Sequence, residues 1–102
     1  MLVDFVGFKV DRVQGIMMLF TKEIVDQKRT DRLFVKIMSL EDEDEVFLEC
    51  EIFDPHMKGI FMSGEFTLID GHIYFNNNVI KMRYDLMQKY GGNGKNQEIY
   101  FN

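Results

Sequence analysis

Hydrophobic and polar residues alternate most strictly over residues 45–53 of the chain. The even positions carry Val46, Leu48, Cys50 and Ile52, and the odd positions carry Glu45, Phe47, Glu49, Glu51 and Phe53. Because successive side chains of a strand point to opposite faces, this period of two predicts a half-buried strand with its odd positions outward. Asp54 and Pro55 predict its end, since proline cannot donate a ladder hydrogen bond.

A second alternating run covers residues 59–69 and leads into the pair Asp70–Gly71. Gly64 is expected to mark a bulge that divides this run into two short strands. An Asp-Gly pair between strands predicts a type I′ hairpin, because that turn needs positive φ at both central residues. The resulting register places Phe66 opposite Phe75.

Three earlier segments have the composition of strands, namely residues 2–10, 16–25 and 32–40. After the hairpin the period changes to that of an amphipathic helix, which is predicted over residues 79–90. Asn78 precedes this segment and is a favourable N-cap.

These elements predict one all-β, mainly antiparallel domain over residues 1–90. Its six or seven strands are expected to form a small barrel or a strongly curved sheet, closed by the C-terminal helix. This outline resembles the pleckstrin-homology-like barrel and the five-stranded OB barrel. Residues 91–102 are expected to be a Gly- and Asn-rich tail, in which EIYF forms either a short last strand or a frayed end.

Composition narrows the classes of function. The 102 residues carry a net charge of -5, which opposes general binding to nucleic acid or to anionic membranes. No signal peptide and no apolar run long enough to span a membrane are visible, and the single cysteine fits a reducing compartment. The expected location is the cytoplasm, of a bacterium or of an infected host.

Residues with catalytic potential are few and scattered. The two histidines, His56 and His72, fall in a predicted turn and on the outer side of a strand, and Cys50 is predicted to be buried and inert. No nucleophile elbow, zinc or phosphate-loop motif occurs. The sequence therefore predicts neither an enzyme, nor a cofactor, nor a metal site.

Acids and aromatic residues on the predicted outer faces favour a protein interface, because an exposed apolar centre with a charged rim is common interface anatomy. The expected partner is another copy of the chain or a protein with a basic surface, as for a small inhibitor or accessory protein of a phage or mobile element. The predicted interface residues are Phe47, Phe53, Phe61, Tyr74, Glu43, Glu45, Glu49 and Glu51.

The alternative is a barrel that binds single-stranded nucleic acid. Exposed aromatic side chains can stack on bases, and a basic cluster can hold the phosphates. The candidate phosphate-binding residues are Lys28, Arg29, Arg32 and Lys36. The acids that alternate with Phe47 and Phe53 would repel phosphates, so a nucleic acid would have to use another face.

Overall fold

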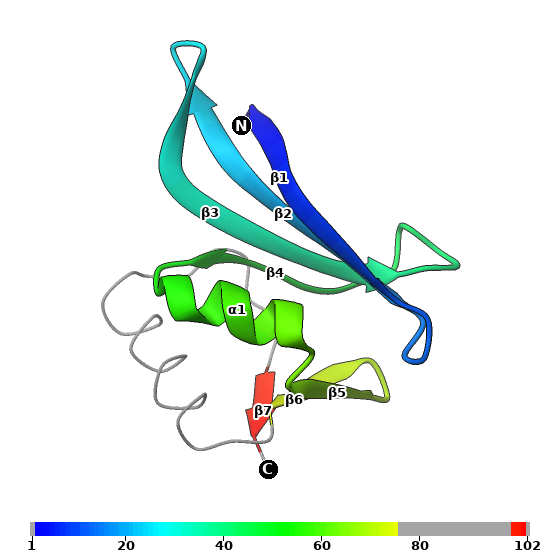
Figure 1. Ribbon diagram of the computed structural model, residues 1–102. Helices are drawn as coiled ribbons and strands as arrows, with labels where there is room; N and C mark the ends of the chain where they lie inside the picture. The colour runs from blue at the N-terminus through cyan, green and yellow to red at the C-terminus, as the bar shows by residue number, and fades with distance from the viewer. Residues whose placement is uncertain (1, 76–98, 102) are drawn as a thin grey trace.

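The computed structural model describes residues 2–75 and 99–101, and β-strands dominate that part of the chain (Figure 1). The elements in chain order are β1 (Val3–Asp11), β2 (Ile16–Val25), β3 (Lys28–Ser39), β4 (Val46–Ile52), α1 (Pro55–Ser63), β5 (Phe66–Ile69), β6 (His72–Phe75) and β7 (Ile99–Phe101). The helix predicted over residues 79–90 lies outside the described residues. Within the described part, no helix is long and apolar enough to cross a membrane.

The strands form two sheets. One is an antiparallel sheet of four strands in the order β1-β2-β3-β4, and it bends strongly along β3 (Figure 1). The other has the order β5-β6-β7, with β7 parallel to β6. The all-β, mainly antiparallel class is confirmed, and so is a last strand within EIYF. The described residues form a curved sheet but no closed barrel.

Tight turns connect the paired strands where positive φ angles are available. Asp26 and Gln27 join β2 to β3 with φ angles of 50° and 66°. Asp70 and Gly71 join β5 to β6 with φ angles of 51° and 79°, which confirms the predicted hairpin. Its register pairs Phe66 with Phe75, as the sequence predicts.

The four-stranded sheet has three register shifts: one lies between Lys22 and Ile24 of β2, and the other two, in β1 and β4, change the directions of phenylalanine side chains. In β1 the register with β2 shifts between Phe5 and Gly7, so that Val6 is an extra residue. In β4 the register with β3 shifts so that Phe47 is skipped between Val46 and Leu48. A bulge of this kind changes which face the following side chains occupy.

The strand predicted over residues 59–69 is wrong in its first half, which belongs to α1. Asp54 is the N-cap of this helix, and its side chain accepts a hydrogen bond from the His56 backbone N–H at 2.9 Å. Pro55 fits the first helical position, where no backbone donor is needed. Gly64 ends the helix in the left-handed region, with φ 75°.

The core lies between one face of the four-stranded sheet, here called the inner face, and the layer formed by α1 and the β5–β6 hairpin (Figure 1). Its fully buried large side chains are Phe20, Phe61, Phe75, Ile16, Met18, Ile37, Leu48, Met57, Ile73 and Val35. The Phe61 ring is the centre of an edge-on aromatic cluster, with centroids 6.1 Å from Phe66 and 5.5 Å from Phe75. Helix and hairpin are therefore packed as one layer.

Gln14, in the β1–β2 turn, connects the two sheets. Its side-chain oxygen accepts a hydrogen bond from Leu68 N at 2.7 Å, and its nitrogen donates to Phe66 O at 3.4 Å. The amide thus bonds to β5 as a residue of a neighbouring strand would. The same nitrogen also donates to an Asp11 carboxylate oxygen at 3.1 Å, which orients the amide group.

We predict that Gln14→Ala lowers the free energy of unfolding by about 1–3 kcal/mol, because it leaves the part-buried backbone groups of β5 without their partner. Chemical denaturation measures this change. Arg12→Ala, in the same turn at an exposed position, is the matched control and should change stability little. Equal stability of the two variants would contradict a connecting role for Gln14.

Candidate functional site

The face of the four-stranded sheet that points away from α1, here called the outer face, carries large apolar side chains. The cross-strand register aligns Phe5 with Thr21 and Thr21 with Phe34, and it aligns Phe8 with Leu19. Residues directly opposite each other point to the same face of a sheet. The apolar residues of the outer face include Val3, Phe5, Phe8, Met17, Leu19 and Phe34.

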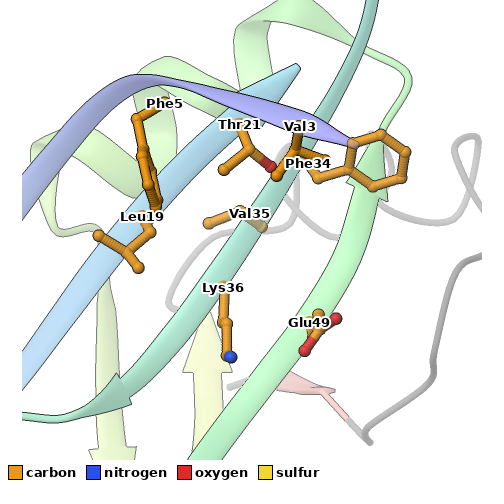
Figure 2. Close-up of a pocket in the computed structure, with 8 residues that line it drawn as sticks. All are labelled: Val3, Phe5, Leu19, Thr21, Phe34, Val35, Lys36 and Glu49. Carbon is orange, nitrogen blue, oxygen red and sulfur yellow. The ribbon is translucent and has the colours of Figure 1, made fainter. Parts of the chain in front are cut away.

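Four of these side chains, Val3, Phe5, Leu19 and Phe34, line a hollow of about 410 Å³. Figure 2 shows the rings of Phe5 and Phe34 on either side of it, and Lys36 with Glu49 at one end. A second hollow, lined in part by Phe8, continues across β1 and shares Phe5 and Leu19 with the first. The two hollows thus form one apolar groove.

Exposure distinguishes this groove from ordinary surface. Phe5 is 66% exposed and Phe8 is 65% exposed, although both residues lie within β1 rather than in a loop. Two neighbouring phenylalanine rings left in water are unfavourable, at about 25 cal/mol for each Å² of apolar area that stays uncovered. Exposed apolar patches of this kind are typical of surfaces that bind another molecule.

Ion pairs flank the groove. Arg32 donates to Glu23 and to Glu51, each at 2.7 Å, and its guanidinium carbon lies 5.2 Å from the centre of the Phe34 ring. The hydrogen bond to Glu51 raises the pKa of Arg32. On the opposite face of the sheet, Arg29 pairs with Asp4 at 2.6 Å. These two cations are thus already matched by carboxylates.

The predicted phosphate-binding residues do not form one basic cluster. Arg29 and Arg32 have the acidic partners just described, and Lys36 lies opposite Glu49 in the register of β3 and β4. Lys28 is exposed at the start of β3. Three of these four side chains therefore lie beside carboxylates.

The four predicted interface aromatics occupy different environments. The prediction that Phe61 points outward is wrong. This residue lies on α1 with 0% exposure and belongs to the aromatic cluster of the core. Phe47 is half-buried and packs against the core; its ring carbons lie 3.9 Å from the position of a Cβ at Gly71. Phe53 is 38% exposed, and Tyr74 is half-buried on β6.

The predicted parity of the strand is confirmed from residue 48 onward. Leu48, Cys50 and Ile52 are buried, whereas Glu49 and Glu51 are half-buried on the outer face. Before residue 48 the bulge disturbs the pattern. Val46 pairs with Met38, and Phe47 contacts the core.

The acidic run remains on the surface. Glu43 and Glu45 are exposed in the loop between β3 and β4. Ser39 Oγ accepts hydrogen bonds from the backbone N–H groups of Glu41 and Asp42, at 3.2 and 3.4 Å. The Asp42 carboxylate also accepts a hydrogen bond from Asp44 N at 3.0 Å, whereas Glu43 and Glu45 stay exposed.

Of the described groups capable of acid–base or nucleophilic chemistry, Cys50 is buried and His56 lies beside a carboxylate that is occupied in a helix cap. Burial raises the pKa of Cys50 to about 12, which disfavours a reactive thiolate. His56 Nδ1 lies 3.0 Å from the carboxylate of Asp54 at the exposed start of α1, where that carboxylate also caps the helix. Within residues 2–75 and 99–101, no group of three His, Cys, Asp or Glu residues could hold a metal ion.

Reasoning from the sequence missed the residues of the outer face, Phe5 and Phe8 above all. An odd and an even position cannot share a face of a regular strand, so their common direction depends on the bulge at Val6. Gly7, beside that position, is the one signal that could have indicated it. Comparison of the chain with protein-family models, with curated proteins and with solved structures found no match.

We predict that Phe61→Ala lowers the free energy of unfolding by about 3–5 kcal/mol, as expected for removal of a fully buried ring. Phe5→Ala, the same substitution at an exposed position, should change it by less than about 1 kcal/mol. Thermal and chemical denaturation measure both. Similar losses for the two variants would contradict the assignment of Phe61 to the core and Phe5 to the surface.

We predict that a thiol reagent at about pH 8 leaves Cys50 unmodified in the folded protein, because burial keeps the thiol protonated. The same reagent should modify it fully once denaturant unfolds the chain. Absorbance of the released chromophore measures both reactions. Rapid labelling of the native protein would contradict the buried position.

Proposed function

We propose that this protein is a non-enzymatic protein-binding module whose contact surface is the outer face of the four-stranded sheet. The observation that carries the proposal is the exposure of Phe5 and Phe8, side by side with the groove formed by Leu19 and Phe34. Aromatic side chains grouped at the centre of a surface are typical anchors of protein interfaces. The proposal keeps the predicted class of function but moves its centre from β4 to β1, β2 and β3.

Charge supports a protein partner over a nucleic acid. The arginine nearest the groove, Arg32, is held between Glu23 and Glu51, and Glu49 lies at one end of the hollow. A phosphate chain over this face would meet these carboxylates at close range. A protein can instead cover the apolar centre and leave the ion pairs at a solvated rim.

The acidic loop fits the same proposed function, because its exposed charges can attract a basic partner. Glu43 and Glu45, with their acidic neighbours, extend from the end of the sheet without an ion-pair partner among the described residues. A cluster of exposed like charges raises the rate at which an oppositely charged partner arrives, and salt weakens the effect. We therefore propose a cytoplasmic partner that carries basic residues beside its apolar contact surface.

We predict that Leu19→Thr combined with Phe34→Thr abolishes partner binding, because it removes two walls of the groove while keeping strand-forming residues. Tagged wild-type and variant proteins are used to recover partners from the source cells, and quantitative mass spectrometry compares what each retains. The variant must first show a cooperative melting transition.

The matched control is Val13→Thr combined with Val25→Thr, because both valines are exposed outside the groove: Val13 lies in the β1–β2 turn and Val25 is the last residue of β2. It should retain partners as the wild type does. Equal recovery by the Leu19/Phe34 variant would contradict the proposal. So would tight oligonucleotide binding at about 50 mM salt that weakens steeply as salt rises, since that is the signature of phosphate contacts.

A further inference from the structure

β1 is an edge strand whose surroundings leave room for another strand. It pairs with β2 along one side, and no described strand pairs with its other side (Figure 1). The unpaired backbone groups of an edge strand are a template for pairing with another chain, and charged side chains and bulges on that strand restrict which chains can pair. The residues of β1 therefore indicate which strand would fit beside it.

The sequence of β1 complements itself when read in reverse. Aligned antiparallel about the point between Val6 and Gly7, the strand places Phe5 opposite Phe8 of a second copy. In the same register Asp4 lies opposite Lys9, and the two outer positions bring valines together. The twofold symmetry repeats each pair, so that both charges and both rings of each strand are matched.

The backbone of β1 presents the correct groups for this pairing. Ile24 N donates to Leu2 O at 2.9 Å, so the carbonyl of Leu2 points toward β2. Because hydrogen-bonding directions alternate along a strand, the backbone groups of Val3 and Phe5 point to the open side. The bulge at Val6 shifts this alternation by one residue. We therefore expect the backbone groups of Phe8 to point to the open side like those of Phe5, just as the two side chains share a face.

The bulge also puts the matched side chains on matching faces. Phe5 and Phe8 both lie on the outer face, opposite Thr21 and Leu19. Asp4 and Lys9 both lie on the other face, one opposite Lys22 and one opposite Met18. In an antiparallel pair related by a twofold axis through the sheet, opposed residues share a face. The pairing therefore joins ring to ring and acid to base.

We propose that β1 pairs antiparallel with β1 of a second copy of this chain, which joins the two four-stranded sheets into one continuous sheet and their outer faces into one apolar surface. This inference rests on the proposed function and names a second copy as one partner of the same surface. Charge complementarity selects that partner, since an unrelated strand would have to supply a base opposite Asp4 and an acid opposite Lys9.

The present contacts of these two charges are compatible with the pairing. Asp4 already accepts from Arg29, and Lys9 Nζ donates to the backbone oxygen of Met62 at the end of α1. Both lie on the partly exposed edge, where an ion pair adds little to affinity. Like charges in the same positions are repulsive, so these residues act on the choice of partner and register.

The test reverses each charge separately. We expect Lys9→Glu to place an acid opposite Asp4, and Asp4→Lys to place a base opposite Lys9, so that each variant has a dissociation constant raised roughly tenfold or more over that of the wild type. Mixed together, the two variants should form a heterodimer, because every opposed pair is then complementary. A chain carrying both changes should regain the homodimer.

Light scattering distinguishes the 12.1 kDa chain from a dimer of twice that mass, and native mass spectrometry identifies the heterodimer. Lys28→Glu and Asp31→Lys make the same charge changes at exposed positions on β3 and are the matched controls. Circular dichroism must show that every variant is folded. If one single variant does not fold, the dimerisation of the chain carrying both changes still tests the pairing.

A wild-type protein that stays monomeric at its highest soluble concentration would overturn the pairing. So would a dimer that forms equally well in both single variants, since it would use another surface. Either result leaves the proposed function standing if the Leu19/Phe34 variant still loses its partners. Loss of the pairing together with unchanged partner recovery by that variant would overturn both.

Discussion

One-sided burial of the four-stranded sheet is the constraint on which the rest of the structure depends. The sheet has two faces, and the described covering layer, one short helix and a small hairpin, packs on the inner one. On β2 the inner residues Ile16, Met18 and Phe20 are almost completely excluded from water, whereas Leu19 between them lines the outer groove. The apolar side chains of the outer face are therefore left outside the described core, and this is the surface on which the proposed contact rests.

The covering layer, formed by α1 and the β5–β6 hairpin, is held together by contacts between side chains and backbone groups of different elements. Phe61 joins helix and hairpin by packing edge-on against Phe66 and Phe75. Gln14 then bonds this layer to the β1–β2 turn through the backbone of β5. Because each link joins the hairpin to another element, removing either would loosen the layer as a whole rather than one strand.

The sequence predicted those elements whose signal is local. Asp70–Gly71 defined its hairpin and register without help from tertiary packing, and strict alternation gave the burial of Leu48, Cys50 and Ile52. Helix α1 was missed although Asp54, Pro55 and Gly64 supply a cap, a first residue and a stop. A period of two continues by chance across residues 59–69, and in so short a helix its few buried residues do not establish a period of 3.6.

The two bulges explain why the candidate site could not be located from the pattern alone. The bulge in β4 turns Phe47 toward the core, whereas that in β1 brings Phe5 and Phe8 onto one exposed face. A bulge usually protects an edge strand, because the distortion prevents a regular partner from aligning. In β1 the distortion lies at the centre of the self-complementary sequence, so a second copy would carry the same distortion at the same place. In the proposed pairing, Gly7 would have no side chain to obstruct Val6 of the opposite strand. The bulge that hinders pairing with other strands would therefore be matched by the bulge of a second copy.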